Sequence, residues 1–383
     1  MILSKTFDAF LALVRQGIGH ESRVLSQDID WTAIKALADT HGLSAVVLEG
    51  VDKCHTDTTD STEMLPLQLK LEWIGEVLQS YEARYKQYEK AISSLAGWYN
   101  QHGFKMMVLK GYACSLDWPN PKHRPCGDID IWQFGKQKEA DAILESSEFR
   151  DESVESVDTV KRIKIDNSHH HHTVFDWEGF TVENHYDFIN VHHHKSNAEF
   201  EKILKQFGED DSHFVVPNGD ASTGSAAKVY LPSPNLHALF LLKHLMMHFA
   251  SEGITMRQVV DWGFFVEKHS KEVDWNYVQE VLERFGMHQM FNVINAICVG
   301  DLGFEVANFP TVQFEPALKD KVLKEILTPK YSANVPKNIF SRVVFKVRRW
   351  RDNEWKHQLC YKDSMWSAFW SGVWNHLLKP SSI

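Results

Sequence analysis

The stretch Arg124–Trp132, RPCGDIDIW, places two acidic residues within a run of apolar ones. Residues i and i+2 of a strand point to the same side, so Asp128 and Asp130 are predicted to project together. The isoleucines that alternate with them would then pack behind. Two carboxylates this close repel each other unless a cation, a proton or a nearby base compensates, and Mg²⁺ is one solution. Solvation or turn capping at a strand end is another, and the triplet alone leaves both open.

The residues before this triplet favour a phosphate site. The segment MMVLKGYACS, residues 106–115, predicts a short buried strand followed by Lys110, Gly111 and a helix. A glycine lets the backbone approach a phosphate closely, and helix N-terminal amides suit an anion. Arg124 adds a fixed positive charge for phosphate oxygens. Strand, Lys-Gly, helix, arginine and Asp-x-Asp in this order is more specific than any one of these signals.

Helical patterns flank a mixed middle region. A helix is predicted to begin after Asp30 and end at Gly42, and a long amphipathic helix is predicted over 66–100. Two strands are expected around a turn at Glu178-Gly179, and 208–225 reads as a loop or linker. Helices return after Pro234. The prediction is an α+β protein with a small mixed sheet, divided into an N-terminal helical region (1–100), a core (101–232) and a C-terminal helical region (233–383).

Composition limits the classes of function. The chain has 383 residues, 43% hydrophobic and 24% charged, with a formal net charge of −10. That charge argues against a nucleic acid partner. Five cysteines without a CxxC pair argue against a disulfide framework. The N-terminal residues are too interrupted for a signal peptide, and no apolar run approaches the ~20 residues of a membrane span, so a cytoplasmic protein is expected.

The central stretch carries a family resemblance. LKGYACSLDWPNPKHRPCGDIDIW, residues 109–132, resembles the signature of the uncharacterised nucleotidyltransferase family of the DNA polymerase β-like superfamily. VENHYDF, residues 182–188, is similar to the family's later acidic-x-His strand. MRQVVDWGFF, residues 256–265, resembles its Arg-x-x-x-Asp helix. The similarity covers roughly residues 60 to 270 and is dense around these motifs. Where superfamily members have Gly-Ser or Gly-Gly, this chain has Gly111-Tyr112.

The resemblance implies a two-metal nucleotidyl transfer site. In such enzymes two Mg²⁺ ions held by three carboxylates bridge the nucleotide's α-phosphate and an acceptor hydroxyl. Asp128 and Asp130 match the first two carboxylates. The nucleotide-binding residues implied are Lys110, Gly111, Arg124, Arg257 and Asp261. Arg257 and Asp261 are also spaced to form an intrahelical ion pair.

The third carboxylate is expected on the hairpin that follows. The acidic candidates there are Asp176, Glu178, Glu183 and Asp187. Strand alternation places Glu183, His185 and Asp187 on one side, whereas Glu178 lies in the turn and is too far out. Glu183 lies two residues before the histidine, as the family's acidic residue does, and mid-strand. We therefore expect Glu183 to bind metal and help deprotonate the acceptor. Pairing of Glu183 with a lysine or histidine across the hairpin is the structural alternative.

These signals predict an Mg²⁺-dependent nucleotidyltransferase. The transfer expected is of a nucleoside monophosphate, AMP from ATP, to a hydroxyl or phosphate of a small-molecule or protein acceptor. The alternative is a non-catalytic relative that binds a nucleotide or a partner. Tyr112, in place of the superfamily's Gly or Ser, favours this alternative.

Three other sequence signals are expected to have structural and not catalytic roles. The histidine runs 169–172 and 192–194 are expected to be exposed at strand edges or in loops. His244 and His248, spaced i, i+4, are expected on a helix surface or in the core because no HExxH pattern accompanies them. A stripe of Trp366, Trp370, Trp374 and Leu377 is expected to dock on the domain, although a membrane surface or a polynucleotide would also suit it.

Overall fold

The structure, a computed structural model, describes residues 5–21, 29–54, 65–150, 160–192, 194–217, 227–331 and 338–366. These residues combine many helices with a six-stranded mixed sheet, which confirms the predicted α+β class. The chain divides into two compact units. The helical unit is drawn from Met1–Arg84, Cys114–Pro125 and Ala238–Met365, and the sheet unit from Tyr85–Ala113, Cys126–His237 and Trp366–Ile383. The three-region division by sequence order stays a prediction.

The N-terminal helices follow their local signals. They are α1 (Lys5–Gly17), α2 (Trp31–His41) and α3 (Ser44–Cys54). The Asp30 carboxylate accepts the backbone N–H of Ala33 at 3.0 Å and so caps α2. Gly42 ends α2 in the left-handed region at φ 65°, where a glycine avoids the Cβ penalty. Both ends of this helix are therefore confirmed.

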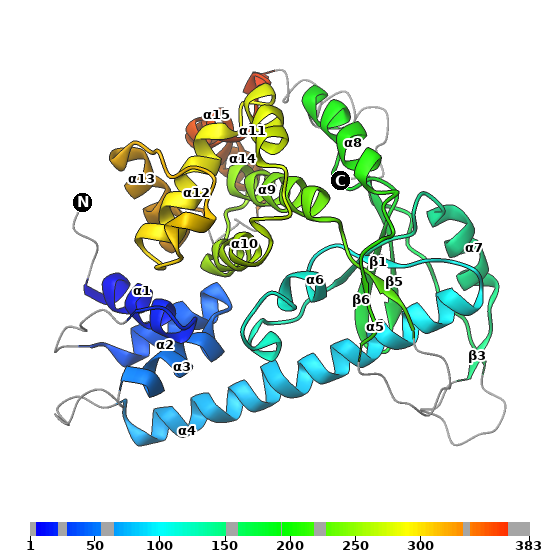
Figure 1. The fold of residues 1–383 in the computed structure, drawn as a ribbon, viewed down its shortest axis with the longest axis horizontal. Helices are drawn as coiled ribbons and strands as arrows, with labels where there is room; N and C mark the ends of the chain where they lie inside the picture. Colours follow the sequence, from blue (N-terminus) through cyan, green and yellow to red (C-terminus); the bar gives the residue numbers. More distant parts are fainter. Residues whose placement is uncertain are drawn as a thin grey trace. The chain divides into compact units, whose positions relative to one another are not determined.

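The long helix is confirmed and contains one irregularity. It consists of α4 (Leu67–Glu76), a π-helical segment η1 (Val77–Ala83) and α5 (Arg84–Gln101). In α5 the buried positions include Tyr85, Tyr88 and Tyr99, which give the helix its apolar face. Tyr88 meets Phe180 of the sheet edge-on, with ring centroids 5.3 Å apart. Figure 1 shows α5 passing alongside the strands.

The sheet has the strand order β5-β6-β2-β1-β8-β7. Its members are β1 (Met107–Val108), β2 (Ile129–Trp132), β5 (His172–Trp177), β6 (Phe180–His185), β7 (Phe214–Val215) and β8 (Val229–Tyr230). The pairs β2–β6 and β1–β8 are parallel, and the others are antiparallel. The predicted turn joins β5 to β6, with Glu178 at φ 47° and Gly179 at φ 80°. This turn sets the register of β5 against β6, and that register determines which residues of the two strands lie opposite each other.

Three sequence-based details differ from the structure. Strand β2 begins at Ile129, so Asp128 lies just before the strand and is exposed. The short strand predicted before Lys110 is only two residues long as β1. The predicted loop at 208–225 contains the edge strand β7, because Phe214 and Val215 pair with β8.

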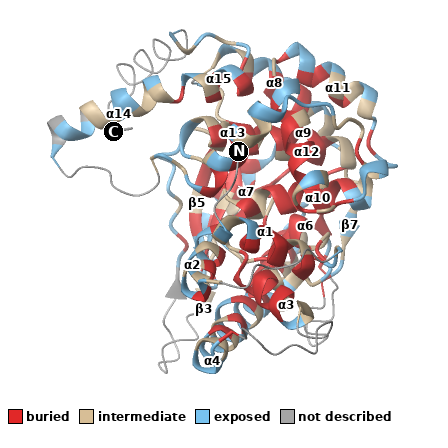
Figure 2. Cartoon of the chain, turned by 90° about the vertical axis from the view of Figure 1, so that its left-hand side faces the viewer, coloured by how far each residue is buried: buried red, intermediate tan, exposed pale blue. Residues whose placement is uncertain are grey.

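The remaining elements complete the two units. They are α6 (Tyr112–Ser115), η2 (Pro121–His123), α7 (Gln137–Ser146), β3 (Phe149–Arg150), β4 (Val160–Lys161), α8 (Lys195–Phe207), α9 (Pro234–Ser251), α10 (Met256–His269), α11 (Trp275–Arg284), α12 (His288–Gly300), η4 (Val306–Asn308), α13 (Pro316–Leu327), α14 (Ile339–Asp352) and α15 (Glu354–Cys360). Figure 2 shows many buried residues in α9, α10 and α12, whereas the coloured residues of α14 are exposed or intermediate. Trp366 is 61% exposed, and the rest of the predicted tryptophan stripe lies outside the described residues.

Candidate active site

Asp130 and Glu183 face each other across two parallel strands. The register of β2 and β6 pairs Asp130 with Glu183, and Trp132 with His185. Ligand atoms of Asp130, Glu183 and His185 all lie within 4.8 Å of one another. The third carboxylate expected from strand alternation is thus close to one of the two aspartates. Asp128 is in neither of the two possible metal-ligand groups found in the described part of the chain.

Cationic side chains balance this carboxylate pair. The Lys110 Nζ atom lies 2.7 Å from Asp130 Oδ1. The His185 Nε2 atom lies 3.3 Å from the same Asp130 oxygen and 3.6 Å from Glu183 Oε2. Asp130 and His185 are buried, and Glu183 is half-buried. Because charges in such surroundings need compensation, Lys110 and His185 make the two carboxylates compatible.

The pKa values follow from this balance. Burial raises the pKa of Asp130, but the Lys110 charge and the bond to His185 lower it more, so the net shift is well downward. Burial also raises the pKa of Glu183, and its contact with His185 outweighs that effect. For His185 burial lowers the pKa, whereas bonds to Asp130 and Glu183 raise it above 6.5. Both carboxylates are therefore ionised at neutral pH and available to a cation.

The Lys110-Gly111 step depends on the absence of a side chain at Gly111. Gly111 has φ 52°, and a Cβ there would overlap the Tyr88 hydroxyl. That hydroxyl donates to the backbone carbonyl of Asp128 at 2.9 Å. Gly111 thereby lets α5 hold the residue at which the Asp-x-Asp motif begins.

Tyr112, the departure from the superfamily pattern, is a core residue. Its ring stacks on Tyr85 of α5 with centroids 6.4 Å apart, and its hydroxyl donates to Glu89 at 3.1 Å. The side chain is 2% exposed. Burial raises the pKa of the Tyr112 hydroxyl, and the Glu89 charge adds to that shift. The larger side chain is accommodated by Tyr85 and Glu89 of α5.

Arg124 and Asp261 form a buried bidentate ion pair within the helical unit. Arg124 Nε lies 2.8 Å from Asp261 Oδ1, and Nη2 lies 3.0 Å from Oδ2. Trp118 Nε1 also donates to Oδ1 at 2.9 Å. The predicted intrahelical pairing of Asp261 with Arg257 is therefore wrong, because among the described residues Arg124 and Trp118 occupy the carboxylate. Burial lowers the pKa of Arg257, as does the nearby Arg124 charge.

The other acidic candidates of the hairpin lie outside the cluster. Asp187 follows the end of β6 and pairs with Lys205 of α8. Glu178 is in the turn, where it accepts a hydrogen bond from Ser94 at 2.6 Å. Asp176 is exposed and faces Thr181 across the hairpin. Among the four candidates of the described hairpin, only Glu183 is in a possible metal-ligand group.

The expectation of exposed histidines at 169–172 is wrong for its last member. His172 begins β5, is 6% exposed, and pairs with His185 in the register of the hairpin. His171 is half-buried beside it. Counting back from the two-residue turn at Glu178-Gly179 places His172 opposite His185, so this neighbourhood could have been found in the sequence.

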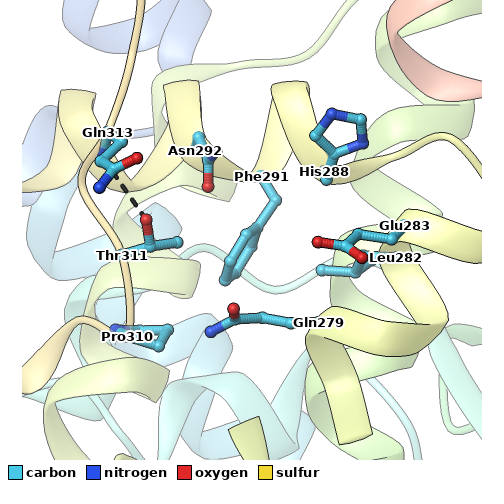
Figure 3. A pocket seen from close by; sticks show the side chains of 9 residues that line it. All are labelled: Gln279, Leu282, Glu283, His288, Phe291, Asn292, Pro310, Thr311 and Gln313. Atoms are coloured by element: carbon cyan, nitrogen blue, oxygen red, sulfur yellow. Dashed lines mark hydrogen bonds between the residues drawn. The ribbon is translucent and has the colours of Figure 1, made fainter. Parts of the chain in front are cut away.

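A separate hollow lies in the helical unit (Figure 3). Its volume is about 350 Å³, and Phe291 projects into it. Its lining is Gln279, Leu282, Glu283, His288, Phe291, Asn292, Pro310, Thr311 and Gln313. None of these is a predicted nucleotidyl transfer residue.

The described part of the chain contains no helix with the length and apolar character needed to span a membrane.

Comparison with known proteins gives the family. A model described as uncharacterised nucleotidyltransferase matches residues 27–299, which include each predicted site residue. No curated protein and no solved structure matches the chain. The matched region covers most of the chain, and the chain therefore belongs to the uncharacterised nucleotidyltransferase family, with nucleotidyl transfer as the activity that this membership gives it.

Proposed function

We propose that the protein transfers a nucleoside monophosphate, AMP from ATP, to a hydroxyl or phosphate of a small-molecule or protein acceptor, and that Mg²⁺ supports the reaction. The observation that carries this proposal is the parallel register that sets Asp130 opposite Glu183. Paired carboxylates offer the oxygen ligands that Mg²⁺ prefers. The net charge of −10 supports an acceptor other than a nucleic acid.

Asp130 and Glu183 are the residues that would hold the ion, and Asp128 is the third candidate. Bound Mg²⁺ would lower the pKa of the acceptor hydroxyl and neutralise charge on the leaving pyrophosphate. The fit rests on the donor set, since two ionised carboxylates lie together and both need a positive partner. In the described structure Lys110 and His185 supply that charge.

Glu183 is the proposed acceptor of the proton from the attacking hydroxyl. It is the more exposed of the two paired carboxylates, with 23% of its side chain accessible against 7% for Asp130. Its pKa lies below the usual value, so it is deprotonated at neutral pH. A deprotonated carboxylate within reach of the acceptor acts as a general base.

Lys110 is proposed to bind a phosphate oxygen of the nucleotide. Its ammonium group lies 2.7 Å from Asp130, and a positive ion bound at Asp130 would compete for the same oxygen. The lysine would then be available to the triphosphate while Gly111 keeps the backbone free of a side chain. Arg124, Arg257 and Asp261 remain predicted nucleotide-binding residues.

The test is to follow label and pyrophosphate together. The protein is incubated with Mg²⁺, α-labelled NTPs and an acceptor-containing lysate, beside an Asp130→Asn variant. We expect labelled acceptor and matching pyrophosphate release with ATP, and neither with the variant. Nucleotide binding without pyrophosphate release across several lysates would contradict the proposal and favour a binding module.

A further inference from the structure

Three histidines form a second possible metal site in the sheet unit. Ligand atoms of His171, His172 and His185 lie within 4.8 Å of one another. The ring centroids are 4.3 Å apart for His171 and His172, 5.2 Å for His172 and His185, and 5.4 Å for His171 and His185. β5 and β6, which carry two of them, lie side by side in Figure 1.

Several of these ring nitrogens are buried without a hydrogen bond. Both nitrogens of His172, and Nδ1 of His171, are inaccessible and have no hydrogen-bond partner in the described residues. The side chain of His172 is only 8% exposed. A buried polar atom left unpaired destabilises the fold, so three in one place call for a ligand that satisfies them together.

His185 has a backbone hydrogen-bond partner on the ring nitrogen that faces away from the carboxylates. Its Nδ1 lies 3.2 Å from the carbonyl oxygen of Asp187, which can only accept a hydrogen bond. Nε2 faces the Asp130 and Glu183 carboxylates, and a cation bound there would replace the hydrogen on Nε2 while Nδ1 keeps its hydrogen bond to Asp187. A carbonyl partner of this kind commonly fixes the tautomer of a metal-binding histidine.

Glu183 supplies negative charge beside this group. Its carboxylate lies 3.8 Å from His172 Nε2 and 3.6 Å from His185 Nε2. Three imidazoles with one carboxylate are a ligand set that suits Zn²⁺ and its neighbours in the first transition row. Mg²⁺ takes oxygen ligands, so the histidine group differs in chemistry from the Asp130–Glu183 pair.

We propose that His171, His172 and His185 bind a divalent transition-metal ion, Zn²⁺ foremost, beside the site proposed for nucleotidyl transfer. Because His185 contacts both Asp130 and Glu183, an ion held by the histidines lies next to the carboxylates. The ordinary alternative, an all-protein histidine core, leaves the buried nitrogens unsatisfied. The inference stands on the histidine geometry and does not require the transfer activity.

The test is a titration of metal-free, untagged protein with Co²⁺, which reports tetrahedral nitrogen ligation through its visible absorption. We expect one Co²⁺ per chain, displaced by Zn²⁺ and not by Mg²⁺. Even groups that only orient metal ligands change affinity 10–100-fold, so His172→Ala should weaken binding by at least ~100-fold. His171→Ala, at a half-buried position, is the second variant if His172→Ala does not fold.

Two further variants make the result specific. His213→Ala is the matched control, because His213 is half-buried like His171, belongs to the same unit and is in neither possible metal-ligand group of the described residues, and it should bind Co²⁺ like wild type. Asp130→Asn should retain Co²⁺ binding even as it abolishes nucleotidyl transfer. Unchanged binding in the folded His172→Ala or His171→Ala protein, or loss of binding in Asp130→Asn, would overturn the histidine site.

Discussion

Asp128 and Asp130 stand two residues apart and occupy different surroundings. Asp128 is exposed before β2, whereas Asp130 is buried between Lys110 and His185. Alternation along a strand predicts that the two share a side, but it carries no information on where the strand begins. The sequence also placed Glu183 on the correct side of its strand. Its partner in space depended on the order of strands, which the local pattern does not contain.

Glu183 and Asp187 provide a matched pair of carboxylates. We expect Glu183→Gln to lower turnover at least ~100-fold, the lower range for a general base. Asp187→Asn should retain most activity, because Asp187 pairs with Lys205 and lies outside the ligand group in the described residues. Steady-state rates of pyrophosphate release measure both. The reverse order of the two variants would refute the assignment of Glu183.

Gly111 and Tyr88 are expected to be energetically coupled. Gly111→Ala places a methyl group against the Tyr88 hydroxyl and imposes a left-handed φ on a residue with a side chain. The backbone strain alone costs roughly 1–2 kcal/mol. Tyr88→Phe removes the hydroxyl, so Gly111→Ala should destabilise the Tyr88→Phe protein less than wild type.

Urea unfolding of wild type, the two single variants and the double variant measures this coupling. Gly97→Ala is the control, because a Cβ there has its nearest neighbour at an ordinary 3.6 Å. Strictly additive effects of the Tyr88 and Gly111 changes would show that the two groups do not interact.

At the scale of elements, the helices were the most predictable part. The caps of α2 and the long helix over α4, η1 and α5 follow from local spacing. The two-residue strands β7 and β8 did not, because pairing with neighbours, and not their own pattern, makes them strands. The ion pair of Arg124 and Asp261 was missed for a related reason. The i, i+4 spacing favoured Arg257, and tertiary packing brought a residue from another segment instead.

Arg124 forms an ion pair with Asp261 of α10. Replacing Arg124 should therefore lower the unfolding free energy of the ligand-free protein. Arg124→Ala leaves the Asp261 carboxylate buried without its cation, a change that costs about 3–5 kcal/mol. Arg162→Ala is the control, because the Arg162–Glu148 pair is exposed and should contribute ~1 kcal/mol or less. Denaturant unfolding without nucleotide measures both. Unchanged stability of Arg124→Ala would show that the ion pair with Asp261 does not stabilise the ligand-free protein.

His41 links α2 to α10 and makes their contact sensitive to pH. Its Nδ1 accepts the backbone N–H of Met256 at 3.2 Å, which requires an unprotonated nitrogen. Burial lowers the pKa of His41 from 6.5 to about 4. The unfolded chain therefore binds more protons between these values, and stability should fall as the pH drops from 6.5 to about 4.

The variant His41→Asn keeps an acceptor but does not titrate. The difference in unfolding free energy between wild type and His41→Asn should thus shrink or reverse on acidification through this window. Urea unfolding at several pH values, with His102→Asn as an exposed control, measures it. A difference that stays constant with pH would show that His41 is not a buried neutral base.

At the scale of the whole molecule, the family match and the net charge of the chain both bear on how a nucleotide would bind. The match covers residues 27–299, and the net charge is −10. Because the chain as a whole is negative, the positive groups of the proposed site act only at short range. We therefore expect a metal ion to neutralise part of the nucleotide's negative charge. The sequence signature predicts the residues that surround the nucleotide's phosphates.

Mg²⁺ and ATP should stabilise the protein only together. At a nucleotide concentration 100-fold above its dissociation constant, binding adds about 2.7 kcal/mol, enough to raise the melting temperature by several degrees. ATP with EDTA should give little shift, and Asp130→Asn should respond to neither mixture. Thermal melts of both proteins measure this. An equal shift with and without Mg²⁺ would contradict a metal-bridged nucleotide.

The parallel pairing of β2 with β6 also sets when the site forms during folding. Parallel strands cannot be joined by a tight turn, and Asp130 and Glu183 meet only after the long intervening chain has closed. The β5–β6 hairpin, with its two-residue turn, can form early and contains Glu183 but not Asp130. The carboxylates are brought together late, against their own repulsion, so a divalent ion should speed the final step of refolding more than the first.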